Sequence, residues 1–241
     1  MTPLGLGAAA LAAGGAWVAW AWLPHLATVG CVWRGPRDGR RLALTFDDGP
    51  DPAHTPRVLD VLAARGVRAT FFLVGERAAR LPGVVRAVVD GGHEVASHGW
   101  SHASLWRCGP RRTAEELGRA HETLAALTGQ APRHFRPPWG HVNAAMFRAL
   151  RRLGERCVFW TIQPEGLRAR DPAAQAADVL RRARPGAIVD LHDADGVPGA
   201  GPRVLAALPG MIHGLREAGY ELVTLGDLIG APGTGGTGPP P

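Results

Sequence analysis

The chain has 241 residues, enough for one full-sized domain with terminal extensions. Its formal net charge is +6, and all 27 basic residues are arginines scattered along the chain without interleaved aromatic residues. This pattern excludes a nucleic-acid-binding stripe, whereas a basic surface suits acidic cell-envelope polymers. The three cysteines, Cys31, Cys108 and Cys157, are widely spaced. They indicate neither a disulfide framework nor a thiolate zinc site, and at most one disulfide bridge can form.

Residues 1–33 are predicted to be a membrane anchor. No charged residue occurs from Pro3 to Trp33, and the apolar run Leu4–Leu23 is long enough to cross a bilayer as a helix. A cleaved signal peptide is the rival interpretation, but no basic residue precedes the run. A buried core helix is a second alternative. The arginines that follow, between Arg34 and Arg41, would by the positive-inside bias keep the next domain in the cytoplasm.

Beyond this segment, apolar runs of strand length alternate with amphipathic helical patterns. Seven strands alternating with helices predict an α/β fold with a parallel sheet closed or nearly closed into a barrel, and an open doubly wound sheet is the alternative. No glycine-rich nucleotide-binding motif follows the first strand. The catalytic domain is expected to span residues 38–230, followed by a disordered Gly/Pro tail, residues 231–241. The predicted strands are Arg41–Phe46, Ala69–Leu73, Glu94–Ser97, Arg133–Arg136, Cys157–Thr161, Ala187–Leu191 and Glu221–Thr224; the predicted helices include Pro56–Arg65, Thr113–Thr128, Asn143–Leu153, Pro172–Arg184 and Arg203–Ala218.

Unusual polar residues fall at the carboxyl ends of successive predicted strands. In an α/β barrel these ends form one face, and active sites are built there from loops on different strands. Residues far apart in the sequence are therefore expected to converge. They are Asp47 and Asp48 after the first strand, His98 and His102 after the third, Arg136 and Trp139 after the fourth, Trp160 after the fifth, and His192 after the sixth.

Adjacent carboxylates at Asp47 and Asp48 are typical of a site that divides two tasks. Like charges repel, so one carboxylate binds a cation and stays ionised while the other is free to take a proton. A surface turn at Asp-Asp-Gly-Pro is the alternative. The four-residue spacing of His98 and His102 lets both imidazoles face one point if the segment turns helically. With one carboxylate they predict a divalent-metal site, with zinc favoured and cobalt, manganese or iron also fitting.

Four motifs in this order resemble those of the carbohydrate esterase family 4 polysaccharide deacetylases, which have the NodB-type homology domain. They are Thr-Phe-Asp-Asp-Gly-Pro, Ser-His-Gly-Trp-Ser-His, Arg-Pro-Pro-Trp-Gly and Leu-His-Asp, and the similarity covers about Arg40 to Ile229. The resemblance implies a distorted (β/α) barrel and metal-dependent removal of acetyl groups from N-acetylated or O-acetylated sugars. It implies Asp47 as general base, Asp48, His98 and His102 as metal ligands, His192 as general acid, Arg136 as the group that holds and tunes Asp47, and Pro138, Trp139, Trp160 and Leu191 near the substrate.

The chain departs from the family pattern at three places. Gly99 replaces a serine or threonine, and Gly166-Leu167 replaces an Asp-Trp pair. Asp190 replaces the leucine that walls the acetyl pocket, two residues before His192. Because alternate side chains of a strand share a face, we expect Asp190 to point toward the barrel interior with His192 and to orient it. The alternatives are that Asp190 pairs with an arginine or binds a substrate hydroxyl, with Glu165 or no residue orienting His192.

The sequence therefore leaves three functions open. The first is an amide deacetylase that acts on an envelope or extracellular polysaccharide, as a monomer, from outside the cytoplasmic membrane. The second is an amidohydrolase on the same barrel that takes a small non-sugar amide. The third is a non-catalytic, membrane-tethered glycan-binding protein.

Overall fold

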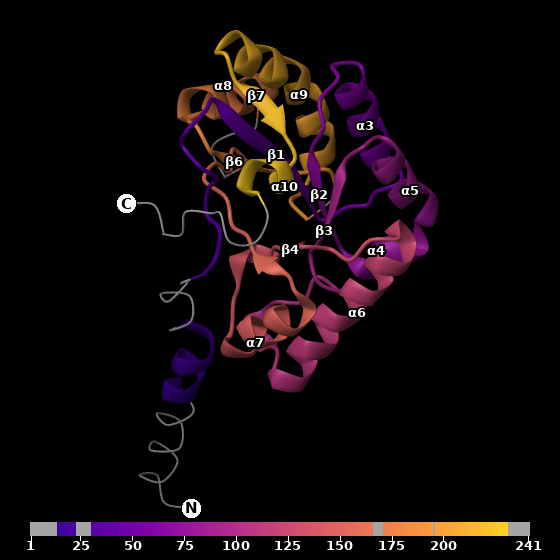
Figure 1. The fold of residues 1–241 in the computed structure, drawn as a ribbon, viewed down its shortest axis with the longest axis vertical. Helices are drawn as coiled ribbons and strands as arrows, with labels where there is room; N and C mark the ends of the chain where they lie inside the picture. Colours follow the sequence, from indigo (N-terminus) through magenta and orange to yellow (C-terminus); the bar gives the residue numbers. More distant parts are fainter. Residues whose placement is uncertain (1–13, 23–29, 166–170, 195, 231–241) are drawn as a thin grey trace, which may run out of the picture.

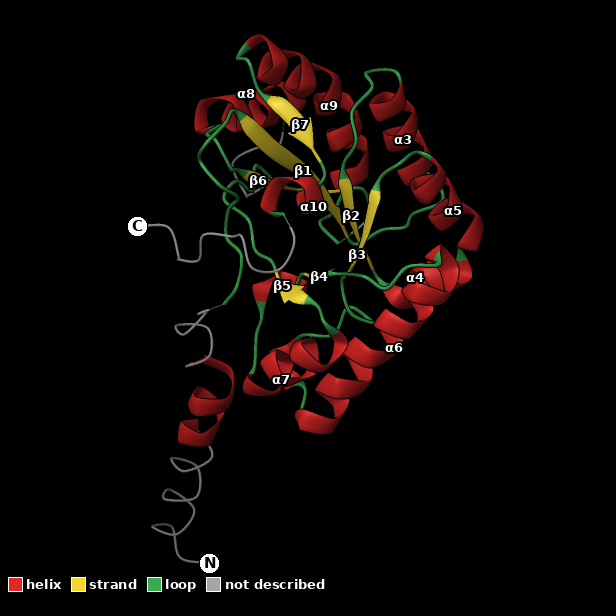
Figure 2. Cartoon of the chain, in the orientation of Figure 1, coloured by secondary structure: helices red, strands yellow, loops and turns green. Residues whose placement is uncertain are grey.

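A computed structural model describes residues 14–22, 30–165, 171–194 and 196–230. Its centre is a seven-stranded, all-parallel sheet surrounded by helices (Figures 1 and 2). The prediction of a distorted (β/α) barrel is confirmed. The strands are β1 (Arg41–Asp47), β2 (Thr70–Leu73), β3 (Glu94–Ser97), β4 (His134–Phe135), β5 (Arg156–Cys157), β6 (Ile188–His192) and β7 (Glu221–Val223).

The helices also follow the sequence pattern, with additions. Five predicted helices are present as α3 (Thr55–Ala63), α6 (Pro110–Thr128), α7 (Ala144–Leu153), α8 (Pro172–Arg182) and α9 (Ala200–Glu217). The described residues also form three further α-helices, after β2 and β7: α4 (Gly75–Arg80), α5 (Pro82–Asp90) and α10 (Leu225–Ile229). Helices α6 and α7 each end at a glycine in the left-handed conformation, Gly129 and Gly154, which carries no Cβ penalty there.

Strand β1 pairs with β2, β6 and β7, and its alternating side chains separate the two sides of the sheet. Its odd-numbered residues, including Ala43 and Thr45, face the barrel interior, where Ala43 packs with Phe72 and Ile188. Its even-numbered residues Leu42, Leu44 and Phe46 belong to the larger apolar cluster that includes the residues of the covering helices. Both faces are buried, which explains why β1 reads as a nearly continuous apolar run.

The sheet order β5-β4-β3-β2-β1-β6 leaves a gap between β5 and β6, and this gap distorts the barrel. The chain that continues from β5 crosses the gap, because Ile162 forms a single parallel bridge with Val189 of β6. Strand β7 pairs with the first half of β1, and β2 pairs with its second half. The strand ends therefore surround a common point, although the barrel is closed by only one bridge on this side.

Only residues 14–22 of the predicted anchor are described, and Val18–Trp22 forms a π-helical turn there. Trp20 donates a hydrogen bond from Nε1 to the carbonyl of Cys108 at 3.1 Å, and the ring of Trp17 meets Trp106 edge-on. In the described part of the chain, no helix combines the length and the apolar character that a membrane span needs. The predicted run Leu4–Leu23 and the tail, residues 231–241, extend outside the described residues, so both stay predictions.

Candidate active site

The predicted polar residues converge at the carboxyl ends of the strands around a cavity of about 90 Å³. This confirms the expectation that distant motifs meet on one face of the barrel. The described residues that line the cavity are Asp47, Asp48, His98, His102, Pro137, Trp139, Trp160, Gln163, Asp190, His192, Gly196 and Val197.

Asp47 and Asp48 diverge because β1 ends between them. Asp47 is the last residue of β1 and lies in register with His192 of β6, so base and acid candidates sit on neighbouring strands. Asp48 follows in the left-handed region at φ 71°, a conformation that aspartate tolerates better than most residues. Arg77 of α4 holds this turn by donating a hydrogen bond to the Asp48 carbonyl at 2.6 Å. The two carboxylates are thereby aimed at different partners, which rejects the surface-turn alternative.

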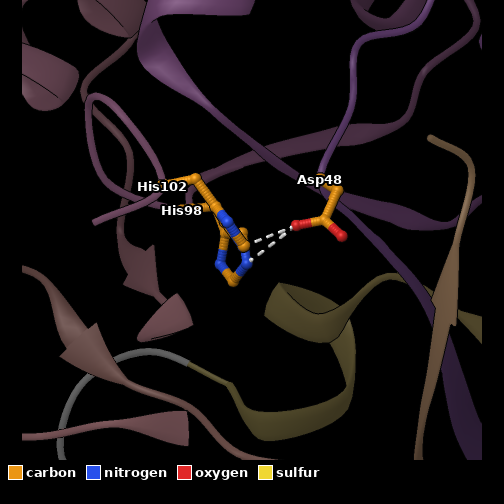
Figure 3. Close-up of side chains that lie close together, drawn as sticks. All are labelled: Asp48, His98 and His102. Atoms are coloured by element: carbon orange, nitrogen blue, oxygen red, sulfur yellow. Dashed lines mark ion pairs between the residues drawn. The ribbon is translucent and has the colours of Figure 1, made fainter. Parts of the chain in front are cut away.

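His98 and His102 converge through a loop after β3, whereas the sequence argument assumed a helical turn. Positive φ values at Gly99 (78°) and His102 (57°) fold the loop back on itself. The two rings then lie 5.1 Å apart between centroids. Figure 3 shows both imidazoles facing the carboxylate of Asp48, with His102 Nε2 at 2.8 Å and His98 Nε2 at 3.4 Å from Asp48 Oδ1. The assumption of helical geometry was wrong, but the predicted juxtaposition is confirmed.

The donor set fits a divalent cation. Asp48 Oδ1 is buried, and two imidazole nitrogens lie within 3.4 Å of it. His98 donates from Nδ1 to the carbonyl of Arg136 at 2.7 Å, which orients its Nε2 toward Asp48 as metal-bound histidines are oriented. Burial alone would raise the pKa of Asp48, but the imidazoles of His102 and His98 outweigh it and hold this pKa well below its usual range. A three-ligand set of this kind leaves coordination positions open.

Arg136 is a fully buried arginine at the centre of the site. Its Nη1 donates to Asp47 Oδ1 at 2.7 Å, to Thr45 Oγ1 at 2.8 Å and to Asp190 Oδ1 at 3.2 Å. Its Nη2 donates to the carbonyl of Phe159 at 3.1 Å. The guanidinium also lies over the ring of Phe72, 4.1 Å from its centroid. One side chain thus links β1, β2, β4, β6 and the segment after β5.

His192 is oriented by Glu165, so the prediction that Asp190 orients it is wrong. Glu165 Oε2 is hydrogen-bonded to His192 Nδ1, and Glu165 Oε1 accepts from the His192 backbone N–H at 3.1 Å. Gln175 of α8 also donates to Glu165 Oε1, at 3.1 Å. Burial lowers the pKa of His192, but the negative charges of Asp190 and Glu165 outweigh it and raise this pKa to about 10. The imidazole therefore keeps its proton at neutral pH, with Nε2 directed to the cavity.

Asp190 pairs with an arginine, the alternative that the sequence left open. It does point into the barrel with His192, as strand alternation predicts, but its oxygens are engaged by Arg136 and by Gln163, whose Nε2 lies 3.0 Å from Oδ2. Burial and the charge of Asp47 raise the pKa of Asp190 to about 7, against the opposing effect of Arg136. Asp190 and Asp47 therefore share one guanidinium, because an aspartate stands where the family resemblance implied a leucine.

The predicted substrate residues divide into two groups. Trp139 and Trp160 line the cavity, and Trp139 is 56% exposed. Leu191 does not line it, because strand alternation points its side chain away from Asp190 and His192 into the cluster under the helices. Pro138 is buried, and its neighbour Pro137 lines the cavity instead. The departure at Gly166-Leu167 lies outside the described residues.

Sequence reasoning missed several groups that complete the site. Thr45 carried a signal, since it lies two residues before Asp47 on the inward face of β1. Gln163 and Gln175 carried none, because no motif marks an amide that reaches a carboxylate from a neighbouring segment. Their partners follow from the path of the chain after β5, which local pattern does not determine.

The sequence of this chain matches the family model for polysaccharide deacetylase over residues 34–158. The chain belongs to the polysaccharide deacetylase family. It is 33% identical over 194 residues to the peptidoglycan-N-acetylglucosamine deacetylase PgdA of Listeria monocytogenes, covering 80% of this chain and 40% of that protein. The chain therefore spans less than half the length of that relative.

Two further comparisons cover most of both proteins. A chitooligosaccharide deacetylase of Bradyrhizobium sp. is 36% identical over 200 residues, covering 78% of this chain and 90% of the relative. The crystal structure of the Bc1960 peptidoglycan N-acetylglucosamine deacetylase, in complex with 4-naphthalen-1-yl-N-oxidanyl-benzamide, superimposes with a TM-score of 0.78 at 29% identity. That superposition covers 85% of this chain and 94% of the other, which places the half-barrel of this chain among solved structures of its family.

Replacing Arg136 tests how the buried charges are balanced. Arg136→Met leaves the buried carboxylates of Asp47 and Asp190 without a positively charged partner. Breaking a buried ion pair in this way costs about 3–5 kcal/mol of unfolding free energy. Adding Asp190→Leu removes one of these unpaired carboxylates, so the double variant should recover part of the lost stability. Urea denaturation of the two variants, the parent and Asp190→Leu alone completes the double-mutant cycle. Strictly additive losses would contradict the shared pairing.

Proposed function

We propose that this protein hydrolyses N-acetyl groups from sugars of an extracellular or cell-envelope polysaccharide, using a divalent metal. The observation that carries the proposal is the convergence of Asp47, Asp48, His98, His102 and His192 on one cavity, where two imidazole nitrogens face the buried Asp48 Oδ1 within 3.4 Å. Family membership and the named activities of the relatives support it.

Asp48, His98 and His102 would hold the metal through the atoms that already face one another. When bound, the ion supplies Lewis-acid polarisation of the acyl carbonyl and acidifies water. The donor set of two imidazoles and one carboxylate suits zinc best, with cobalt, manganese and iron as alternatives. The identity of the metal belongs to the proposal.

Asp47 acts as the general base. Arg136 engages its Oδ1, so Oδ2 remains to accept the proton of the attacking water. The same arginine keeps the carboxylate turned into the cavity, because four acceptors fix the guanidinium itself.

His192 acts as the general acid. Glu165 holds Nδ1, and the raised pKa of about 10 keeps Nε2 protonated for transfer to the leaving amine. Water adds to the acyl carbon, the carbon–nitrogen bond breaks, and the products are acetate and a free amine on the sugar. The exposed ring of Trp139 beside His102, with 4.2 Å between ring centroids, offers a surface on which a sugar ring can pack.

A small amide is the second candidate substrate, and the polar wall of the cavity favours it. Asp190 and Gln163 stand together in the lining, where an apolar wall would suit an acetyl methyl group. Assays of the purified protein on peptidoglycan, acetylated chitooligosaccharides and small acyl amides, each with and without added metal, distinguish the candidates. Turnover of neither polysaccharide with any divalent metal would reject the main proposal.

Separate replacement of ligand and base should separate metal binding from turnover. The double variant His98→Ala, His102→Ala should lose both the metal and activity, because it removes two of three ligands. Asp47→Asn should keep the metal and lose turnover by a factor of about 10² or more, since general-base catalysis contributes this much. Metal analysis after dialysis, paired with deacetylation assays, reads out both. Full metal content in the double variant would show that the ligand assignment is wrong.

Replacing Glu165 and replacing Asp190 should have different effects on catalysis through His192. Glu165→Ala removes the hydrogen bond at Nδ1, so kcat should fall about ten-fold or more, and Glu165→Asp should restore part of it. Removing this carboxylate lowers the raised pKa of His192, so its proton is lost at lower pH and the alkaline limb of the pH–rate profile should move down.

Asp190→Leu is the matched control, since it leaves the Glu165 contact intact. It should reduce kcat less than Glu165→Ala, although it too should move the alkaline limb to lower pH, because the charge of Asp190 also raises the pKa of His192. A larger loss of kcat in Asp190→Leu than in Glu165→Ala would show that Asp190 orients His192.

We further propose a location on the outer side of the cytoplasmic membrane, with residues 1–33 as the tether. A polysaccharide substrate of the envelope supports this orientation, whereas the arginines after the apolar run oppose it. Added protease should cleave the domain in intact spheroplasts, with a cytoplasmic protein as the protected control. Complete protection until the membrane is lysed would place the domain inside.

A further inference from the structure

Two cysteines far apart in the sequence lie side by side at the edge of the barrel. Cys31 precedes Val32, Cys157 is the last residue of β5, and Val32 and Val158 form a parallel bridge. The bridge is fixed by two hydrogen bonds, from Val32 N to the Cys157 carbonyl and from Phe159 N to the Val32 carbonyl, each of 2.8 Å. This register places Cys31 directly opposite Cys157.

The side chains of the pair point to the same side and meet. Both are buried, with 1% and 4% exposure, in one apolar cluster with Phe135 and Phe159. Burial and a hydrogen bond with the neighbouring Cys31 thiol raise the pKa of Cys157 well above its ordinary value. Neighbouring strands run about 4.7–4.9 Å apart, which lies within the Cα separation of about 4.4–6.8 Å that a disulfide spans.

We propose that Cys31 and Cys157 are a disulfide-forming pair that covalently fastens the N-terminal segment to the barrel in the mature protein. All three cysteines are free thiols in the structure. Bond formation is thiol–disulfide exchange: the two thiols give up two protons and two electrons, and the disulfide of an exchange partner is reduced to two thiols. The new bond joins the segment that leads from the predicted tether to the strand at the edge of the sheet.

The surroundings make this a structural bond formed during folding. Exchange requires a thiolate, and burial with a raised pKa suppresses the thiolate once the barrel has closed. The tether segment is also held there by other contacts, such as the stacking of Trp33 on Phe159 at 4.1 Å between centroids. The bond in the cell rests on the extracytoplasmic location proposed above, because disulfides persist in oxidising compartments. The pairing itself does not depend on that location.

Cys108 provides an internal control. It lies in the same apolar cluster, but its thiol donates to the carbonyl of Ser104 at 3.4 Å. No backbone bridge of the described chain places Cys108 opposite either of the other cysteines. It is therefore expected to stay reduced under conditions that join the pair.

Differential alkylation of the full-length protein, exported and purified in detergent, tests the pairing. Thiols are blocked with iodoacetamide in denaturant, then the protein is reduced and labelled with N-ethylmaleimide before peptide mass spectrometry. We expect iodoacetamide on Cys108, N-ethylmaleimide on Cys31 and Cys157, and a linked peptide in the unreduced digest. Iodoacetamide on all three cysteines would overturn the bond in the exported protein.

A second experiment distinguishes a wrong cysteine pairing from a wrong cellular location. Reduced full-length protein is denatured and refolded with oxidised glutathione. A Cys31–Cys157 bond formed here but absent from the exported protein would overturn the bond in the cell and leave the pairing intact, whereas its absence in both arms would reject the pairing.

Stability measurements supply an independent readout. The oxidised parent should unfold about 5–10 °C above the reduced parent, the size expected when a disulfide constrains a long loop. Cys31→Ser and Cys157→Ser should each abolish the dependence on reductant, while Cys108→Ser should retain it. Equal melting temperatures of the parent with and without reductant, at confirmed oxidation state, would overturn the fastening role.

Discussion

The geometry of the site depends on the burial of one arginine. Arg136 has no exposed surface, and a charge taken out of water must be compensated by partners of opposite charge or by hydrogen-bond acceptors. Its four acceptors come from β1, β6 and the segment after β5, so the arginine ties together strands on both sides of the gap in the barrel. A compact arrangement of Asp47 and His192 follows, because they stand in register on the strands that Arg136 connects.

Strand alternation decides which residues the site receives. Thr45, Asp47, Asp190 and His192 face inward from two adjacent strands, whereas Phe46 and Leu191 between them enter the apolar cluster under the helices. Replacement of an apolar residue at position 190 therefore changes the interior of the cavity and leaves the outer packing alone. The carboxylate of Asp190 is tolerated there because Arg136 and Gln163 engage it. Its burial and the charge of Asp47 still raise the pKa of Asp190 to about 7.

The site separates its two adjacent aspartates by a change of backbone direction. Asp47 still belongs to β1 and is bound by Arg136, while Asp48 lies in the left-handed region and faces the two histidines. On the opposite wall, Glu165 holds His192 through both of its oxygens, and Gln175 of α8 braces Glu165. The chain after β5 thus supplies both the carboxylate that orients His192 and part of the cavity lining, Trp160 and Gln163.

The sequence by itself determined the alternation of seven strands with helices and the residues that meet at the strand ends, because both follow from local periodicity and from motifs that carry their own spacing. It determined Asp48, His98 and His102 as a set, although the loop at Gly99 brings them together without the helix that the spacing suggested. Only the tertiary structure decided that Glu165 orients His192, that Asp190 pairs with Arg136, and that Cys31 meets Cys157. These contacts join segments whose relative position is set by the closure of the barrel, and no local pattern encodes which side chain reaches across.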